Sequence, residues 1–396
     1  MDPQNDWPEK WFYFNEDWCR RNTGKWFGLK PGVTSMGIGE LDFPPHPGVL
    51  KRIYSDLHNI GTGYPEDRGL DRTIQAIASF QKQIFSHELT LDELVIVPRV
   101  TFAIEAVISA ILSDGGEVVV IGNPVYGRFY DIISRFSKNV SVVQFSRIAD
   151  KLALDMASLE QAISSRTKVI FICNPHNPTG YCLSQKEIES IGKLAKLYDA
   201  LILSDEIYGC LDLSGKFVPS FKIMKRMGVR CVALSSFGKA FAVNGFQGGY
   251  MMSDPDTINR IHSFFKRPVF ATSRLTQLSM EGCVDCAKDW LTHLRPVLYN
   301  NRNYLHELLA EIDILDLILP DAGYSTWIHV RKSGDNSDVS EQISDTLNIQ
   351  LGSGKYFWPK TNNHIRINFG TSKENLMGKV KSIHDYFVNQ YFPKRR

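Results

Sequence analysis

Seven short apolar runs, most of them separated by helical patterns, constrain the fold of this 396-residue chain more than any other feature of its sequence. The runs span residues 94–97, 118–121, 140–143, 168–173, 200–204, 232–235 and 248–252. A run that stays apolar throughout is typical of a strand covered on both faces, and a helix between two strands favours parallel pairing. We therefore predict an α/β fold with a doubly wound, mainly parallel sheet.

The length of the chain and the places where two predicted helices begin indicate two domains. With 43% hydrophobic residues, the chain can bury a substantial core. One predicted helix begins near Pro47, and a long helical pattern begins at about Asp289. We predict an N-terminal arm (1–46) that forms part of the small domain, a large domain (47–288) and a smaller C-terminal α+β domain (289–396).

The composition argues against several classes of protein. The 45 Lys plus Arg residues nearly balance the 43 Asp plus Glu residues, so the formal net charge of +2 gives no electrostatic reason to expect nucleic acid as a partner. No apolar run approaches the roughly 20 residues of a membrane span. Residues 1–7 are too polar and acidic for a signal peptide. We therefore expect a cytoplasmic enzyme that acts on small molecules, without membrane or nucleic-acid partners.

The seven cysteines fit reduced core thiols better than disulfides, because their number is odd and most of them lie in apolar stretches. Cys283 and Cys286 have the spacing of metal or redox ligands. No second pair and no nearby histidine cluster accompanies them in the sequence, so we predict no metal site.

Polar residues follow three successive apolar runs, where each predicted strand ends. The first run breaks into a turn that contains two X-Pro steps and Asn177. The second leads into Asp205, and the third leads shortly afterwards to Lys239. Open α/β sheets bind ligands at the carboxyl ends of their strands, so an amide, an acid and a lysine in these places predict a site.

These three residue types suit the chemistry of pyridoxal 5'-phosphate (PLP). A buried lysine with a lowered pKa can form an imine with the PLP aldehyde, and an acid can pair with the protonated pyridine nitrogen and make the ring an electron sink. Each residue alone has a simpler interpretation, Lys239 as a solvated charge and Asp205 as a helix cap. Their occurrence at three strand ends in this order favours the PLP site.

The chain also resembles a known family, the fold-type I, class I/II aminotransferase superfamily of PLP enzymes. Within that superfamily the likeness is greatest to the cystathionine β-lyase-like carbon–sulfur lyases. The stretches that carry the resemblance are residues 21–26, 39–43, 63–64, 123–126, 174–178, 232–239 and 365–368. The resemblance implies the fold-type I architecture, PLP joined to Lys239, and an amino acid as substrate.

The resemblance also assigns contacts to the cofactor. The backbone amides of Val100 and Thr101, at the start of a predicted helix, would hold the phosphate together with the Ser236 hydroxyl. Tyr64 would reach from one subunit into the phosphate site of its neighbour, which implies a homodimer with shared active sites. Tyr126 would stack on the pyridine ring.

Further assignments concern the chemistry and the substrate. Asn177 and Tyr208 would hydrogen-bond the phenolic oxygen of PLP, and Asp205 would pair with its ring nitrogen. Arg366, in an alternating C-terminal strand, would fork onto the substrate carboxylate. Lys239, Asp205 and Tyr208 are therefore the predicted catalytic residues.

Five positions depart from the patterns of the relatives. Gln247 stands where aminotransferases typically have an Arg that binds the phosphate, and Gln there looks like the carbon–sulfur lyases. Tyr208 instead looks like the aminotransferases, because the lyases tend to have His at this position. Glu40 and Gly238 replace an Asp and a Ser, which leaves the substrate open. Arg99 replaces Gly or a small residue, and is either an added phosphate contact or a surface charge.

In the predicted reaction, Lys239 takes the Cα proton of the amino acid while Asp205 keeps the ring protonated. The resulting carbanion can expel a β-substituent such as a thiolate, which yields pyruvate and ammonia, or it can lead to transamination. We predict carbon–sulfur β-elimination, with an aminotransferase as the alternative. Another elimination or a cyclisation in a biosynthetic pathway, and a non-catalytic PLP-binding protein, are further alternatives.

Overall fold

The computed structural model describes residues 8, 11–59, 61–148, 151–265, 270–331 and 337–391. Residues 1–7 lie outside the described residues, and the cytoplasmic location stays a prediction. Among the described residues, no helix is both long enough and apolar enough to cross a membrane. All seven cysteines are buried as free thiols, including Cys283 and Cys286.

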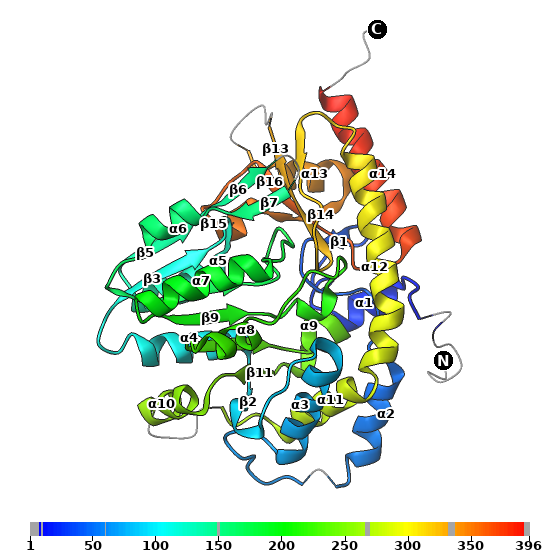
Figure 1. Ribbon diagram of the computed structural model, residues 1–396. Helices are drawn as coiled ribbons and strands as arrows, with labels where there is room; N and C mark the ends of the chain where they lie inside the picture. Colours follow the sequence, from blue (N-terminus) through cyan, green and yellow to red (C-terminus); the bar gives the residue numbers. More distant parts are fainter. Residues whose placement is uncertain are drawn as a thin grey trace.

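The large sheet contains seven strands in the order β2-β11-β10-β9-β8-β3-β5 (Figure 1). Their bounds are β2 Leu94–Val97, β3 Glu117–Ile121, β5 Val140–Val143, β8 Thr167–Cys173, β9 Leu201–Asp205, β10 Cys231–Ser235 and β11 Gly249–Met252. Every pair from β10 to β5 is parallel, and β11 is antiparallel to both of its neighbours. The seven apolar runs of the sequence are these seven strands, and the mainly parallel sheet is confirmed.

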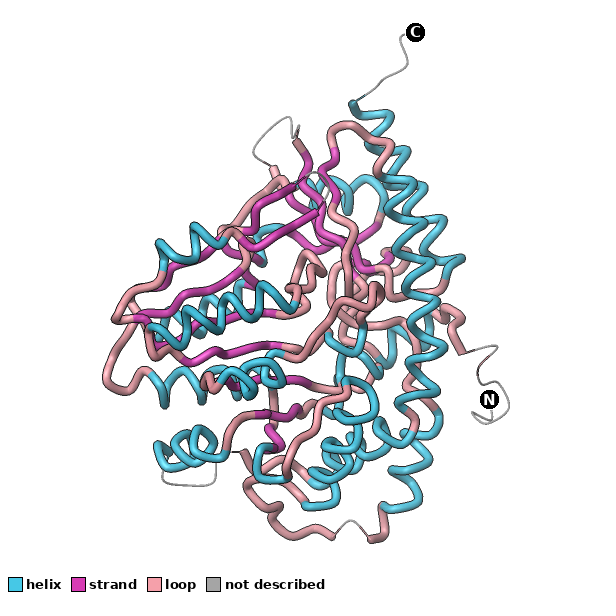
Figure 2. The backbone as a smooth tube through the Cα atoms, in the orientation of Figure 1, coloured by secondary structure: helices cyan, strands magenta, loops and turns pink. Residues whose placement is uncertain are grey.

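Helices cover both faces of this sheet, as Figure 2 shows. In β8, Val169 and Phe171 belong to one hydrophobic cluster and Ile170 and Ile172 to another, because successive side chains point to opposite faces. The first cluster takes side chains from α4 (Val100–Ile111), α5 (Gly127–Phe136) and α10 (Pro255–Phe265). The second takes them from α3 (Asp71–Phe85), α6 (Met156–Ala162), α7 (Gln185–Leu197) and α8 (Ser220–Met227). Burial on both faces explains why the strands are apolar throughout.

The second sheet has five strands in the order β1-β14-β16-β13-β12. Their bounds are β1 Thr34–Met36, β12 Leu315–Leu317, β13 Ser325–Val330, β14 Ile349–Ser353 and β16 His364–Asn368. Strand β1 pairs in parallel with β14, so a segment of the N-terminal arm joins the C-terminal sheet. The domain limits of the sequence analysis (1–46, 47–288 and 289–396) stay a prediction.

The remaining helices include α12, the longest helix among the described residues. The long helix α12 packs along α14 at one side of the molecule (Figure 1). The bounds are α1 Glu16–Asn22, α2 Pro47–Asp56, α9 Gly238–Phe241, α11 Arg274–Asp285, α12 Ala287–Leu309, α13 Val339–Leu347 and α14 Lys373–Tyr391. The 3-10 helices are η1 Leu91–Glu93, η2 Gly209–Leu211, η3 Asn244–Phe246 and η4 Gly354–Tyr356.

Two short antiparallel pairs complete the fold. Strand β6 (Phe145–Ile148) pairs with β7 (Lys151–Leu154), and β4 (Val125–Tyr126) pairs with β15 (Phe357–Trp358). The second pair joins a turn of the large sheet to the segment that follows β14. It therefore brings C-terminal residues beside Tyr126.

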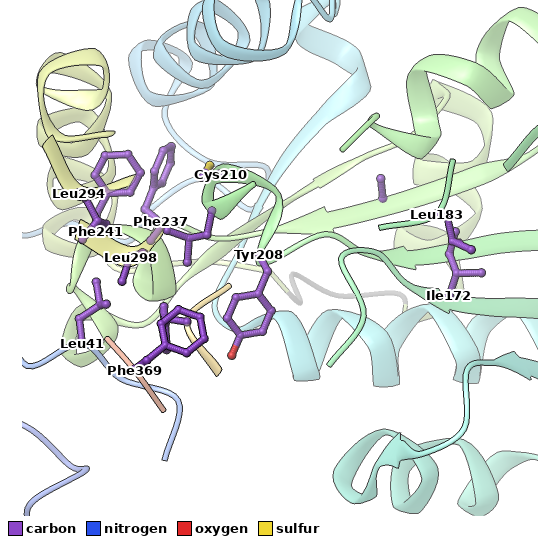
Figure 3. Close-up of a cluster of buried hydrophobic side chains, with 14 of the residues drawn as sticks. Leu41, Ile172, Leu183, Tyr208, Cys210, Phe237, Phe241, Leu294, Leu298 and Phe369 are labelled. Atoms are coloured by element: carbon purple, nitrogen blue, oxygen red, sulfur yellow. The ribbon is translucent and has the colours of Figure 1, made fainter. Parts of the chain in front are cut away.

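Core side chains from distant segments meet where the two sheets adjoin (Figure 3). Leu41 from the N-terminal arm, Phe241 from α9, Leu298 from α12 and Phe369 after β16 belong to the same hydrophobic cluster as Tyr208. All five side chains are buried. The walls of any site between the sheets are consequently packed on a common core.

Candidate active site

A cavity of about 1010 Å³ lies at the carboxyl ends of β8, β9 and β10. Eight of the residues predicted from the sequence line it: Val100, Thr101, Tyr126, Asn177, Asp205, Tyr208, Lys239 and Arg366. Parallel strands end at the same edge of a sheet, which is why residues that are far apart in the sequence meet here.

Lys239 lies in the short helix α9, directly after β10. Its Nζ donates a hydrogen bond to the carbonyl oxygen of Gly39. Burial lowers the pKa of Lys239 to about 8, although the nearby Glu40 carboxylate opposes that shift. At neutral pH a fraction of the amine is therefore unprotonated, as a nucleophile or a base requires.

Asp205 is the last residue of β9 and is almost fully buried. Its Oδ1 accepts a hydrogen bond of 3.0 Å from the backbone N–H of Ile207. Burial raises the pKa of Asp205 to about 7. Across the described residues no Lys, Arg or His forms an ion pair with it, so a cationic N–H donor in the cavity would stabilise the carboxylate.

The neighbouring acid, Glu206, is equally buried but has a structural role. Its Oε1 accepts hydrogen bonds from the backbone N–H of Ser220 (2.7 Å) and from the Ser204 hydroxyl (3.0 Å). Glu206 does not line the cavity. Of these two adjacent acids, only Asp205 is available to a ligand there.

Arg366 reaches the cavity from β16, in the second sheet. Its Nη1 donates to Oδ1 of Asn177 at 3.1 Å, and its Nη2 donates to the carbonyl oxygen of Gly37 at 2.7 Å. The guanidinium carbon lies 5.3 Å from the centre of the Phe357 ring. These contacts fix the orientation of the guanidinium group, whose paired N–H donors can bind a carboxylate.

Tyr208 is buried beside Lys239. Its ring packs edge-on against Tyr324 with 5.7 Å between the ring centres, and burial raises the pKa of Tyr208 to about 12. The phenol therefore stays protonated and can donate a hydrogen bond. Tyr126 packs edge-on against Phe129 at 5.2 Å.

Two residues that the sequence analysis did not single out complete this region. The Tyr324 hydroxyl donates a hydrogen bond of 3.0 Å to the carbonyl of Gly39, the same oxygen that Lys239 contacts. A Cβ atom at position 39 would lie 3.0 Å from the Tyr208 hydroxyl and 3.6 Å from the Lys239 nitrogen. Gly39 therefore leaves room for ligand chemistry around both side chains, which no local pattern around Gly39 or Tyr324 would reveal.

The N-terminus of α4 forms another wall of the cavity. Helix α4 begins at Val100, and its N-cap residue, Arg99, makes no side-chain capping hydrogen bond. In the described part of the chain, the backbone N–H groups of Val100 and Thr101 have no hydrogen-bond partner. Free amides at a helix N-terminus can hold an anion such as a phosphate.

Three predicted site residues lie outside the cavity lining. The Ser236 hydroxyl accepts a hydrogen bond of 3.0 Å from the backbone N–H of Gly238 and so caps a turn. Gln247 is exposed, and its Oε1 accepts a hydrogen bond of 2.5 Å from Nε of Arg99. Tyr64 is fully exposed. The predicted phosphate roles of Ser236, Gln247 and Tyr64 stay predictions.

Comparison with known proteins places this site in a family. Residues 31–383 match the family described as aminotransferase class I and II. The chain belongs to this family. Its members are PLP enzymes, and PLP is the cofactor of this enzyme.

Individual relatives in the family carry different activities in their names. The chain is 28% identical to the Bacillus subtilis protein YugH, provisionally named as an aminotransferase, over 87% of this chain and 89% of that protein. It is 22% identical to cystathionine beta-lyase PatB of Bacillus subtilis, over 91% of this chain and 94% of that protein. Cystalysin from Treponema denticola, a crystal structure with a PLP cofactor, has the same fold, with a TM-score of 0.86 at 16% identity over 96% of this chain and 99% of that one.

The cavity residues fit PLP. Lys239 provides an amine of lowered pKa, and Asp205 provides a buried carboxylate without a cationic partner among the described residues. The free amides of Val100 and Thr101 provide a phosphate site at a helix N-terminus. These groups match the aldehyde, the ring nitrogen and the phosphate of PLP, respectively.

Proposed function

We propose that this enzyme acts on an α-amino acid with a sulfur substituent at Cβ and catalyses carbon–sulfur β-elimination. The observation that carries the proposal is that Lys239, Asp205 and Arg366 line one cavity. When bound, PLP supplies an electron sink for negative charge at the substrate Cα. Lys239 would transfer the proton, Asp205 would keep the ring nitrogen protonated, and Arg366 would bind the substrate.

Arg366 is proposed to bind the substrate α-carboxylate. Its fork is held by Asn177 and Gly37, so the orientation of the carboxylate is set before chemistry begins. The Lys239 amine then takes the Cα proton, and a pKa of about 8 suits a base that works near neutral pH. Asp205 would accept the hydrogen bond of the ring nitrogen, and Tyr208 would donate one to the phenolic oxygen.

Gln247 supports elimination over transamination. A neutral amide at this position is similar to the carbon–sulfur lyases, and PatB is a relative with a lyase name. The products would be the thiol, pyruvate and ammonia.

Transamination is the second candidate, and Tyr208 favours it. Lyases of this family tend to have His where Tyr208 stands, and YugH is a relative with an aminotransferase name. In this case Lys239 would deliver the proton to the cofactor carbon instead, and the substrate would leave as a 2-oxo acid.

One experiment separates the two reactions. Holoenzyme is incubated with L-cystathionine, and pyruvate and pyridoxamine phosphate are measured in the same samples. Elimination predicts pyruvate in amounts far above the enzyme concentration, whereas Lys239→Ala should give none. Pyridoxamine phosphate without pyruvate, across a panel of amino acids, would favour transamination. If neither product forms with any amino acid, the proposed function is wrong.

A further inference from the structure

The mouth of the active-site cavity carries two cations without acidic partners. Arg128 lies in the first turn of α5, and Lys360 follows β15. Both line the cavity, and both are exposed. Asp131 of α5 also lines the cavity, but within the described ranges neither Arg128 nor Lys360 forms an ion pair, so their charges remain available to a ligand.

Two other cations of the mouth have acidic partners. Arg135 pairs with Glu105, with 3.6 Å between Nη1 and Oε1. Lys355 pairs with Asp338 at 3.3 Å and with Glu341 at 3.1 Å. The mouth therefore contains both paired and unpaired cations, which a test can compare.

The elements that carry Arg128 and Lys360 are fixed to each other. Strand β15 pairs with β4, directly before α5. The Trp358 ring stacks on Tyr130 of α5, with 4.4 Å between ring centres and 10° between ring planes. Both cations thus line the same cavity from packed elements, and Arg366 lines it from β16.

We infer that the enzyme selects amino acids whose side chain ends in a carboxylate, and that Arg128 and Lys360 bind this second carboxylate. The inference rests on the proposed amino-acid chemistry, in which Arg366 holds the α-carboxylate. A guanidinium can hold a carboxylate through paired N–H donors, and an ammonium adds a compact charge. The two unpaired cations at the mouth suit a substrate with a negative charge at each end.

The test compares two substrates that differ only in this charge. S-(2-carboxyethyl)-L-cysteine ends in a carboxylate, and S-(2-carbamoylethyl)-L-cysteine ends in a neutral amide of similar shape. Their dissociation constants are measured from the absorbance of the bound cofactor, and kcat/KM from pyruvate release. We expect the carboxylate to be preferred by about tenfold or more, as charge-assisted hydrogen bonds allow.

Variants then assign the preference to residues. Arg128→Gln and Lys360→Gln should each reduce the preference by about fivefold, whereas Arg135→Gln, at an already paired cation, should leave it unchanged. All three side chains are exposed, so folding should be retained, and thermal unfolding checks this. No preference in the wild type, or an equal fall in all three variants, would overturn the inference.

Failure of the proposed function would look different. If neither compound releases pyruvate, β-elimination is wrong, but the absorbance titration still measures which compound binds more tightly. Glutamate and glutamine give the same comparison for transamination. A binding preference for the carboxylate that falls in Arg128→Gln but not in Arg135→Gln supports the inference even then, and a preference for the amide overturns it.

Discussion

At the level of single residues, burial brings the pKa values of two charged side chains close to neutrality. It lowers the pKa of Lys239 to about 8 and raises that of Asp205 to about 7. Both groups lie at strand ends in one cavity, where the carboxylate and the amine favour each other's charged forms. Proton exchange near neutral pH follows from this environment.

The pH dependence of cofactor uptake should report the pKa of Lys239. Only the neutral amine attacks the PLP aldehyde, so the rate of uptake by the apoenzyme should rise with pH through about 8 and level off above it. Stopped-flow absorbance of the bound cofactor measures this rate. A midpoint near 10.5, the value of an ordinary lysine, would contradict the effect of burial.

Glu40 provides a control for this measurement. Its carboxylate stabilises the protonated form of Lys239. Removing that charge in Glu40→Gln should lower the pKa of the lysine further, so the midpoint should move to lower pH. An unchanged midpoint, or a shift to higher pH, would contradict the electrostatic coupling of Glu40 to Lys239.

Arg99 should contribute to cofactor affinity. Its Nε donates to Gln247, and it directly precedes the free amides of α4. A phosphate at this helix N-terminus would gain a nearby positive charge from Arg99. We expect Arg99→Gln to raise the dissociation constant of PLP about tenfold, measured by absorbance titration of the apoenzyme.

Two further variants make the Arg99 prediction specific. Introducing Gln247→Arg into Arg99→Gln should restore much of the affinity, because position 247 contacts position 99 and the change returns a cation close to the N-terminus of α4. Arg226→Gln removes an exposed charge on α8 and should leave the affinity unchanged. Equal affinities of the wild type and Arg99→Gln would show that Arg99 is only a surface charge.

At the level of elements, strand positions were predictable but some directions and pairings were not. Burial on both faces leaves uninterrupted apolar runs, as in β8 and β9, and such runs are visible in the sequence. A run of this kind looks the same whichever way it points, so the antiparallel direction of β11 could not be predicted. The pair β4 and β15 has two residues on each strand, too few for a periodic pattern.

A buried ion pair secures the segment between α1 and β1 to the residues after β1. Lys25 Nζ lies 3.0 Å from Oδ2 of Asp42, and both side chains are fully buried. The indole N–H of Trp26 donates to the other carboxylate oxygen at 2.7 Å. Removing one partner would leave the other charge buried and unpaired.

Lys25→Met should therefore lower the free energy of unfolding by about 3–5 kcal/mol, which denaturant titration can measure. Lys82→Met is the matched control, because the pair of Lys82 with Glu88 is exposed and should scarcely affect stability. If Lys25→Met unfolds at the same denaturant concentration as the wild type, the buried pair does not stabilise this region.

At the level of the whole molecule, the cavity depends on both sheets. Asn177, Asp205 and Lys239 come from the large sheet, and they could be predicted as neighbours because parallel strands end at one edge. Gly39 and Arg366 belong to the segment after β1 and to β16, respectively. Their contacts with Lys239 and Asn177 exist only in the assembled tertiary structure, so the resemblance could suggest them but no local pattern could.

The fully exposed side chain of Tyr64 raises the question of a second subunit. Similarity to the family implies that this residue completes the phosphate site of a neighbour, so we predict a homodimer with shared sites. Sedimentation equilibrium should give twice the chain mass of 44.9 kDa. A monomer that retains full activity would exclude shared sites.

Mixing two impaired variants tests the shared site directly. Tyr64→Ala retains Lys239, and Lys239→Ala retains Tyr64, so a hybrid dimer should contain one intact site and one doubly impaired site. After subunit exchange, random reassociation should restore about a quarter of wild-type activity, although each variant alone is strongly impaired. Tyr54→Ala, at another exposed tyrosine, should be active without mixing. If mass spectrometry shows that hybrid dimers have formed but activity does not return, Tyr64 acts within its own subunit or has no role in the site.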